Sequence, residues 1–568
     1  MNDVVAHESI SKSGRSQPGA PSPCVSSEAG ALHVIAAARL PVGVCVAEIP
    51  WMARHGGARV GIGFAKLRLD IERAWQSAMR VDCHEALVIA DLIEHQATRL
   101  SASAAKALRC EIAALRAVAF VLQDDEAAAL AAAWSARGAH ATATTAHVAL
   151  TVCRSVYWRL GDLESFYAVE RFKPGHQPTR RQTVSTLFDL GLDAAVALDQ
   201  MHFGAARLLA AHALERGRCL VGTHPLADTF PVCVIAQVLY EQGQVDEAEA
   251  LLVARIAGIR ECCTVESALR AHGLLARIAA SRGQHGRALV ILSEAEALGV
   301  RRRWPRLRAA SLAHQVEIEA GCGRVEQAAN CLQRLAELAD ESRAASSNVR
   351  VEIARFHTVA EVRLALAHSP CAGNVDVDVD VDAVRQVHRD MVRRGRLYAA
   401  VAVELLLVDA LLASGQRDEA LERLVGVLRR APVVGLHQTL VDCSARVAEL
   451  IDAIVQRRIV APGDIGELLP YARMLRQHRR DVSEANEPFA IRRPNVGAGI
   501  TERERLIVAL MGRGLSNKQI AVELGIAPET VKSHAKHLYT KLSVRNRTEA
   551  VALATRLGLL HAPRSSAV

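Results

Sequence analysis

Basic and hydroxyl side chains recur at helical spacing between residues 528 and 542. At about 100° per residue, one side of a helix over this range would carry Glu529, Lys532, Ser533, Lys536 and Thr540. The opposite side would carry the apolar residues Val531, Ala535, Leu538 and Leu542. Lysine and serine side chains donate hydrogen bonds to phosphate oxygens and to base edges. The pattern therefore predicts a helix that packs on one side and enters the major groove of DNA with the other.

Capping residues around this helix indicate four short helices between residues 500 and 560. Serine, threonine or asparagine followed three residues later by glutamate or glutamine forms a capping box at a helix start. Such pairs are Thr501 with Glu504, Ser516 with Gln519, and Asn546 with Glu549. Gly525 suits a tight turn, and Pro528 suits the first position of the next helix. We therefore expect two helices, a tight turn and two further helices.

Positive charge is concentrated in the same segment. The chain of 568 residues has a net charge of +8, with 69 Lys and Arg against 61 Asp and Glu. Residues 500–560 hold ten Lys and Arg against five Glu, which amounts to +5 of that total. Such an excess favours a polyanionic partner. The rest of the chain is rich in Ala and Leu, which favour helices, and strand patterns are nearly absent.

The segment with these caps and charges also carries a family motif. Residues 500–550 read ITERERLIVALMGRGLSNKQIAVELGIAPETVKSHAKHLYTKLSVRNRTEA. This stretch resembles, without a gap, the helix-turn-helix pattern of LuxR/FixJ-type regulators, LTxREREVLxLxAxGxSNKEIAxxLxISxxTVKxHxxxIxxKLxVxxRxEA. Two departures are mild: Ile500 stands where Leu is usual, and Ala527 replaces the Ser that caps the recognition helix. Loss of that cap costs about 1 kcal/mol and removes no groove-facing group.

The resemblance implies roles for individual residues. Lys532, Ser533 and Lys536 occupy the positions that enter the major groove. The positions that resemble phosphate anchors are Thr530, Ser516, Asn517, Lys518, Lys541 and Arg547. The fourth helix would supply a dimer surface made of Ala550, Val551, Ala554 and Leu557. Lys518 and Lys541 are also open to interpretation as solvated charges, and Ser533 as touching no base. His534 suits a packed position better than a DNA contact.

A second pattern repeats along the middle of the chain. Four segments share Gly-x-x-x-x-Ala between amphipathic runs, at Gly243 and Ala248, Gly283 and Ala288, Gly323 and Ala328, and Gly415 and Ala420. The first three glycines are 40 residues apart, and fainter copies are marked by Ala86, Ala128, Phe166 and Ala206. Gly can end one helix, Asp246 or Asp418 can cap the next, and Ala lets the two helices approach closely. Each unit is therefore predicted to be a helical hairpin that packs on its neighbours.

This array resembles tetratricopeptide (TPR) repeats, in the longer form of large MalT-like bacterial regulators, over roughly residues 70–450. An ordinary helical bundle is the alternative, but it would not require a period near 40 in so many units. The predicted fold is all-α, a TPR-like α-solenoid followed by a four-helix LuxR-type helix-turn-helix domain. The expected segments are a disordered segment 1–30, the repeats 31–472, a linker 473–498, the DNA-binding domain 499–562 and a tail 563–568.

Motifs of catalysis and of cofactor binding are absent from the sequence. The glycine cluster HGGARVGIGFAK lacks the Lys-Ser/Thr of a P-loop, so the ATPase module of large MalT-like regulators is not expected. The stretch NVDVDVDVD has Val381 and Val387 where an EF-hand needs Gly and Glu, and is interpreted as a solvated acidic loop. The 13 scattered cysteines and the lack of a signal peptide indicate a cytoplasmic protein. We expect no enzyme, no catalytic residue, no metal and no cofactor.

Together these features predict a bacterial transcription regulator. The helix-turn-helix domain would read double-stranded promoter DNA as a homodimer and contact RNA polymerase. The solenoid would bind a small-molecule or protein ligand as the signal, and the arginine-rich range 473–498 would link the two parts. No membrane partner is expected. The alternative function is a TPR-like protein-interaction scaffold with a vestigial helix-turn-helix domain.

Overall fold

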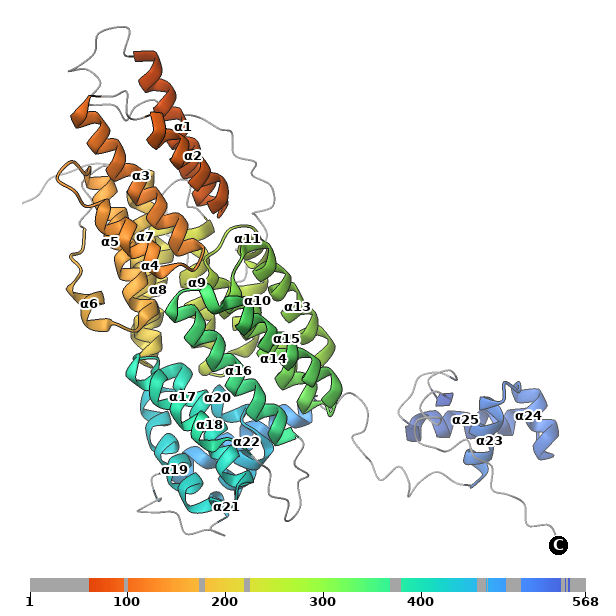
Figure 1. Cartoon of the computed structure of the whole chain (residues 1–568). Coiled ribbons are helices and arrows are strands. Elements are labelled where there is room, and N and C mark those ends of the chain that lie inside the picture. Colours follow the sequence, from red (N-terminus) through yellow and green to blue (C-terminus); the bar gives the residue numbers. More distant parts are fainter. Residues whose placement is uncertain are drawn as a thin grey trace, which may run out of the picture. The chain divides into compact units, whose positions relative to one another are not determined.

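The computed structural model shows an all-helical chain (Figure 1). The residues that it describes are 61–96, 101–172, 179–218, 225–367, 379–456, 466, 468–486, 502–542, 547, 550 and 551. By its contacts the chain divides into Met1–Ala65 and Lys66–Val568, and the first unit contributes only the start of α1 to the description. The predicted segments 1–30 and 563–568 lie outside the described residues. All regular elements in the described part are helices, which confirms the predicted fold class.

The first helices of the repeat region contribute to two hydrophobic clusters, and α6, α7 and α8 belong to the second of them. Their bounds are α1 Gly61–Met79, α2 Cys83–Gln96, α3 Ala102–Leu122, α4 Glu126–Ser135, α5 Ala143–Leu160, α6 Leu163–Ala168, α7 Arg180–Asp199, α8 Phe203–Arg218 and α9 Pro225–Glu241. Buried side chains of α1 to α5 join those of α9 to α14 in one continuous cluster. Each hairpin thus buries its apolar face against neighbouring hairpins, as a repeat array requires.

The later helices continue the array. Their bounds are α10 Val245–Val253, α11 Ile256–Glu261, α12 Val265–Ser281, α13 His285–Arg302, α14 Pro305–Gly321, α15 Val325–Glu341, η3 Ser342–Ala344, α16 Ser347–Ala367, α17 Val381–Arg393, α18 Leu397–Ala413, α19 Arg417–Val434, α20 Gln438–Val441, α21 Ala445–Val455 and α22 Leu468–Asn486. Helices α12, α14 and α16 follow one another and pack side by side. None of the helices in the described part of the chain has the length and apolar character to cross a bilayer.

The hairpin turns follow the predicted geometry. Gly283 ends α12 at φ +69°, and the equivalent glycines 243, 323 and 415 also have positive φ. This left-handed conformation lets the N–H of Gln284 reach the carbonyl oxygen of Ala279 at 2.9 Å, which closes the helix end. Four residues after Gln284, Ala288 is fully buried. The glycines and the alanines of the four main repeats are therefore confirmed.

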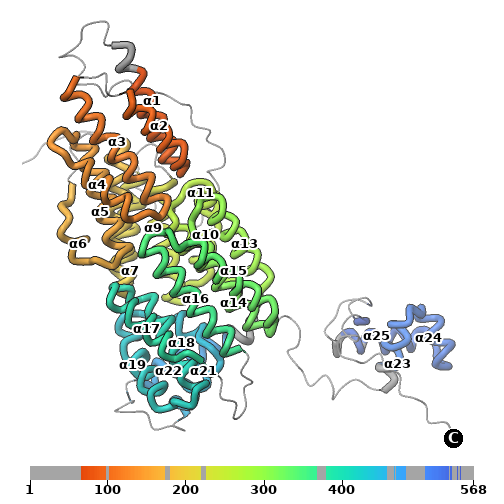
Figure 2. The backbone as a smooth tube through the Cα atoms, viewed as in Figure 1, coloured from red at the N-terminus to blue at the C-terminus, as the bar shows by residue number. Residues whose placement is uncertain are grey.

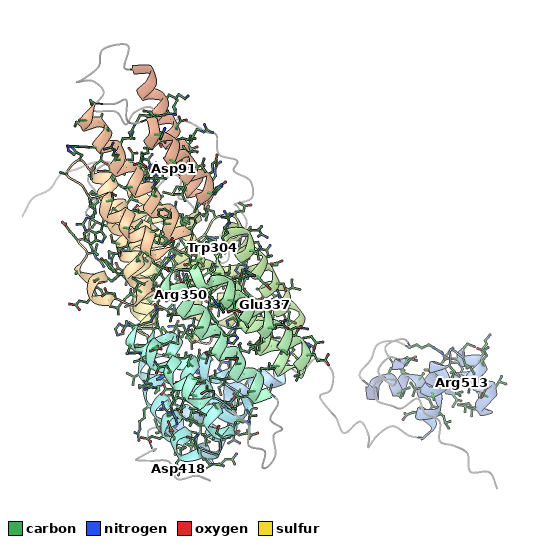
Figure 3. The ribbon with its side chains drawn as sticks, in the orientation of Figure 1. Asp91, Trp304, Glu337, Arg350, Asp418 and Arg513 are labelled. Carbon is green, nitrogen blue, oxygen red and sulfur yellow. The ribbon has the colours of Figure 1, made fainter. Side chains whose placement is uncertain are left out.

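Two details of the repeat prediction are wrong. Asp246 and Asp418 do not cap their helices, because the N-cap positions belong to Gln244 and Gln416, which make no side-chain cap. The two aspartates lie in the first helical turn instead, where a negative charge interacts favourably with the helix dipole. Asp418 is labelled in Figure 3. In the second fainter repeat the fully buried small residue is Ala129, one position after the predicted Ala128.

The end of the Asp-Val stretch is helical rather than a loop. Asp380 is the N-cap of α17, and its Oδ1 accepts the N–H of Ala383 at 2.8 Å. The flanking Val379 and Val381 are buried, each 8% exposed. The described end of this stretch is therefore a capped helix start, whereas residues 374–378 lie outside the described residues.

Helices far apart in sequence meet within the repeat region. The indole N–H of Trp304, labelled in Figure 3, donates to the carbonyl oxygen of Leu122 at 2.6 Å. Helix α18 packs on α7 and α20 packs on α9. Helices α7, α9 and α18 are labelled in Figure 2, and α20 is labelled in Figure 1. The hydroxyl of Tyr240 in α9 also donates to Asp442. The array therefore curls until later repeats contact earlier ones.

A buried ionic cluster stabilises the contact between earlier and later repeats. Arg306 of α14 donates from Nε to Asp124 at 2.7 Å and from Nη2 to Glu266 at 2.6 Å, and all three side chains are buried. Burial alone would raise the pKa of Glu266, but the guanidiniums of Arg306 and Arg159 lower it to about 2. Glu266 is therefore ionised and paired with Arg306 at neutral pH, whereas burial raises the pKa of Asp124 although Arg306 opposes that shift.

The predicted linker begins later than expected. Residues 473–486 continue α22, which packs on α19, α20 and α21. Ala472 and Leu475 of this helix are fully buried in the repeat core. The arginine-rich composition indicated a solvated linker, but apolar residues at helical spacing between the arginines attach the helix to the repeats. The range 473–498 is thus a linker at most in its second half, whose residues 487–498 lie outside the described residues.

Candidate nucleic-acid interface

The C-terminal helices form a small domain with its own core. They are α23 Glu502–Gly512, α24 Asn517–Leu524 and α25 Pro528–Leu542. Their shared hydrophobic cluster contains buried Ile507, Leu510, Met511, Ile520, Ala521, Val531 and Ala535. Leu538 is also fully buried, so the apolar stripe predicted on α25 is confirmed at its three described positions; the side chain of Leu542 lies outside the described residues. Helix α25 is thereby fixed with its other side outward.

The connection between α24 and α25 has the predicted turn. Ser516 and Gln519 form a complete capping box at the start of α24. Gly525 ends this helix at φ +62°, and the N–H of Ile526 bonds to the carbonyl oxygen of Ala521 at 3.0 Å. Pro528 then opens α25, and Ala527 stands at its N-cap without a side-chain acceptor. The helix-turn-helix geometry therefore arises from local capping. Thr501, Asn546 and Glu549 of the other predicted boxes lie outside the described residues.

The outward side of α25 presents the predicted polar residues. Glu529, Thr530, Lys532, Ser533 and Lys536 are all exposed. The Nζ of Lys532 lies 2.7 Å from Oε1 of Glu529, and both side chains are more than half exposed. Such an exposed pair contributes about 0–1 kcal/mol, so it can separate readily when a phosphate competes for the lysine. The sequence did not single out this pairing, although the i,i+3 spacing is a signal for it.

The start of α24 places three further predicted residues beside one another in sequence. The hydroxyl of Ser516 accepts the N–H of Gln519 at 3.4 Å and lies 2.9 Å from its Oε1. Asn517 is half-buried, whereas Lys518 is exposed. The hydroxyl of Ser516 therefore already serves the cap, and Lys518 is the charged group that this helix start offers to solvent.

Arg547 has a role inside the domain that the sequence did not indicate. Its Nη2 donates to the carbonyl oxygens of Met511 at 3.1 Å and of Leu515 at 2.5 Å. These acceptors lie at the end of α23 and in the loop that follows it. The arginine thus satisfies main-chain oxygens that a helix end leaves open. The described contacts therefore favour a structural role over the predicted phosphate anchor.

The predicted dimer surface is only partly described. Ala550 is fully buried, and Val551 packs half-buried against the domain core. A methyl group buried within one chain is not available to a second one, so Ala550 is corrected to a core residue. Ala554 and Leu557 lie outside the described residues, as does the side chain of Lys541.

Comparison with known families matches both parts of the chain. Residues 498–554 match the luxR family of bacterial regulatory proteins. Residues 104–457, more than half of the chain, match the MalT-like TPR region. The two matches coincide with the helix-turn-helix domain and with the helical repeats described above.

Individual relatives agree with these families. The chain is 30% identical over 169 residues to the HTH-type transcriptional regulator MalT of Vibrio cholerae, a match of 27% of this chain and 18% of the relative. It is 40% identical over 90 residues to the transcriptional regulatory protein LnrK of Bacillus subtilis, covering 16% of this chain and 40% of the relative. The match thus spans less than a fifth of the MalT relative's length.

Among solved structures, the chain is similar to a Rap protein crystallised with competence and sporulation factor. The TM-score is 0.46 at 11% identity, over 68% of this chain and 99% of the Rap chain. From the two family matches, the chain belongs to the MalT-like TPR region family and carries a regulatory domain of the luxR family.

Proposed function

We propose that the chain is a transcription regulator whose helix-turn-helix domain reads promoter DNA. The observation that carries this proposal is the orientation of α25, whose apolar stripe is buried while Lys532, Ser533 and Lys536 face solvent. A recognition helix in the major groove needs this arrangement, with the side chains of one face directed at base edges. Thr530 and Lys518, both exposed, and Lys541 would contact the adjacent phosphates.

The regulator would act as a homodimer on two half-sites and contact RNA polymerase. Because Ala550 is buried, the dimer surface is restricted to other positions of the fourth helix, among them Ala554 and Leu557. The domains that we propose are a repeat region that extends through α22 to Asn486 and a DNA-binding domain over residues 499–562. The repeat region would receive the signal by binding a ligand, without nucleotide hydrolysis. ATP hydrolysis by the purified chain would contradict that last point.

DNA binding by the full chain tests the proposal. Genomic fragments that the protein selects would be titrated by fluorescence anisotropy at several salt concentrations, with the wild type, Lys532→Ala and Lys536→Ala. Replacing a lysine that contacts a phosphate should reduce the steepness of the salt dependence of binding by about 0.9. Replacing a lysine that contacts a base should weaken the binding free energy by about 1–3 kcal/mol and relax the preference at one position of the DNA site. Lys106→Ala, which removes an exposed lysine of α3, is the matched control.

The same titration distinguishes the proposed function from the alternative function. A scaffold with a vestigial helix-turn-helix domain would bind every fragment weakly, and its affinity would be the same in Lys532→Ala, Lys536→Ala and Lys106→Ala. That result would overturn the proposed function.

A further inference from the structure

Helix α22, the last helix of the repeat region, has two sides of different character (Figure 1). On one side Leu468, Ala472 and Leu475 are buried in the repeat core. On the other side Arg473 and Arg480 are exposed. These two arginines are seven residues apart, so at about 100° per residue they lie on one stripe of the helix. Helix α22 therefore has the same kind of pattern as α25, a buried apolar side and an exposed basic side.

Polar contacts add to the attachment of α22. The hydroxyl of Tyr471 donates to the carbonyl oxygen of Leu436, in the loop between α19 and α20. Two helical turns later, Nδ1 of His478 lies 2.6 Å from Nε2 of His437. Because these contacts and the buried apolar residues lie at several points along the helix, they define its rotation about its own axis. The exposed arginines of α22 are therefore presented to solvent in a fixed direction.

The other two arginines of α22 make contacts within the fold. The Nε of Arg476 lies 3.5 Å from Oδ1 of Asp452 in α21. The Nη1 of Arg479 lies 3.6 Å from Sγ of Cys443, in the loop between α20 and α21. Both side chains are thus directed toward neighbouring elements of the repeat region. Their positive charges belong to the packing of the helix rather than to its exposed side.

Arg473 and Arg480 have no such partner among the residues that the structure describes. The nearest acid in sequence, Asp481, accepts a hydrogen bond from Nε2 of Gln477 at 2.8 Å. Seven residues of α-helix span about 10 Å, and one strand of DNA carries a phosphate about every 3.4 Å along its axis. The two guanidiniums can therefore contact different phosphates of one strand, and each can do so with two N–H donors.

The place of α22 in the chain limits its distance from the DNA-binding domain. Residues 487–501 join α22 to α23, the first helix of that domain. A chain of this length spans at most about 50 Å when fully extended. One turn of B-DNA is about 34 Å long, so this limit corresponds to about one and a half turns of the duplex. DNA bound by α25 therefore has flanking base pairs within reach of α22.

We propose that the exposed side of α22, through Arg473 and Arg480, binds backbone phosphates of the DNA that flanks the site read by α25. The inference rests on the DNA-binding function proposed above and adds a second contact surface to it. This surface contributes affinity without sequence preference, because bonds between guanidinium and phosphate carry no information about the bases. It also lets the repeat region affect DNA binding, since a ligand or partner that covers α22 removes these contacts.

The salt dependence of DNA binding by the full chain tests this surface. A promoter fragment that the wild type selects is used in two lengths, trimmed to the half-sites and extended by about 20 base pairs on each side. On the extended fragment, Arg473→Gln/Arg480→Gln should reduce the steepness of the salt dependence by about 1.8, which is two contacts at about 0.9 each. On the trimmed fragment, this variant and the wild type should have the same steepness. Arg473→Lys/Arg480→Lys keeps both charges and should retain the wild-type steepness on both fragments.

The matched control is Arg350→Gln/Arg417→Gln, which removes the same charge from exposed positions of α16 and α19 and should bind as the wild type does. Arg350 is labelled in Figure 3. Because all four arginines are exposed, both double variants should unfold at the wild-type Tm. The inference is overturned if Arg473→Gln/Arg480→Gln has the same salt dependence as this control on the extended fragment.

Two further variants separate that failure from a failure of the proposed function. Lys532→Ala and Lys536→Ala are measured on the same two fragments. If they weaken binding and Arg473→Gln/Arg480→Gln does not, the chain reads DNA through α25 and the inference about α22 is wrong. If none of these variants changes binding, the proposed function and the inference are both wrong.

Discussion

Positive charge has opposite uses in the repeat region and in the helix-turn-helix domain. In the repeats, Arg306 is buried and bonded to two carboxylates, one of which lies 182 residues earlier in the chain. In the domain, Lys532 is exposed and paired only with Glu529, three residues away. A buried guanidinium stabilises contacts between distant helices, whereas an exposed lysine on a fixed helix remains available for an external partner.

The two regions also differ in how far apart in sequence their hydrogen-bonded residues lie. Hydrogen bonds in the repeat region join residues far apart in sequence, such as Tyr398 and Glu241 at a separation of 157 and Arg396 and Asp199 at 197. In the domain, the bonds of Arg547 to Met511 and Leu515 span 36 and 32 residues. Changes in the buried ionic clusters should therefore destabilise many repeats together, whereas changes in the domain should remain local.

The largest loss of unfolding free energy is expected for Arg306→Ala. The substitution leaves Asp124 and Glu266 buried without their main cationic partner, and such losses cost about 3–5 kcal/mol. Urea unfolding followed by tryptophan fluorescence measures the change, since Trp304 and Trp158 lie in the repeat region. Arg308→Ala on the same helix is the control: its pair with Glu341 is largely exposed, so the expected loss is at most about 1 kcal/mol. Equal losses in both variants would refute the contrast between buried and exposed pairs.

Acid should destabilise the repeat region through His147. Its ring is 3% exposed and stacks on Phe172 with centroids 4.5 Å apart, and burial lowers its pKa from 6.5 to about 4. Because the unfolded chain binds the proton more readily, this contribution to stability is complete above about pH 6.5 and is lost as the pH falls toward 4. Between pH 7 and pH 4.5 the loss is on the order of 2–3 kcal/mol.

The measurement compares unfolding free energies at the two pH values. His147→Gln should be less stable than the wild type at pH 7, since the stacking is lost, but its stability should fall less on acidification. If the difference in unfolding free energy between the wild type and His147→Gln is the same at pH 7 and at pH 4.5, His147 is excluded as the titrating group.

A smaller, local effect is expected for Arg547→Ala. The substitution removes the donor to the carbonyl oxygens of Met511 and Leu515 and should destabilise the end of α23 by about 1–2 kcal/mol. Hydrogen exchange of the amides in residues 502–542 should increase, while the repeat amides are unchanged. If exchange stays the same and only the salt slope of DNA binding falls, Arg547 acts as the phosphate anchor that the family resemblance implies.

The repeats show how far local patterns predict this fold. The period of 40 and the glycines 243, 283 and 323 predict hairpins because each turn depends on a few neighbouring residues. The bond between Arg306 and Asp124 could not be predicted, since no local pattern marks which of the many arginines meets an acid 182 residues away. The same limit explains the misplaced linker: composition in 473–486 indicated solvent, but packing of Leu475 on distant helices decided its position.

For the candidate site, the exposed face of α25 could be predicted more closely. Helical periodicity alone separates Lys532 and Lys536 from Val531, and the structure confirms which of these side chains are exposed. Arg547 and Ala550 could not be placed in this way, because their roles depend on contacts with the end of α23 and on burial in the domain, which no local pattern marks. Base and phosphate contacts remain predictions, since they depend on a partner whose shape the chain does not specify.

The smallest expected effect concerns the N-cap of the recognition helix. Ala527 precedes Pro528 and accepts the N–H of Thr530 only with its carbonyl oxygen, at 2.9 Å. Ala527→Ser would add a hydroxyl acceptor for an amide of the first turn and should stabilise α25 by about 0.5–1 kcal/mol, which slows exchange of these amides about two- to fivefold. Ala527→Gly, which adds no acceptor, should gain less. Because the cap lies beside the groove-facing residues, a rise in promoter affinity with Ser but not with Gly would show that disorder of this turn opposes DNA binding. Unchanged exchange would instead show that the carbonyl contacts already hold the turn.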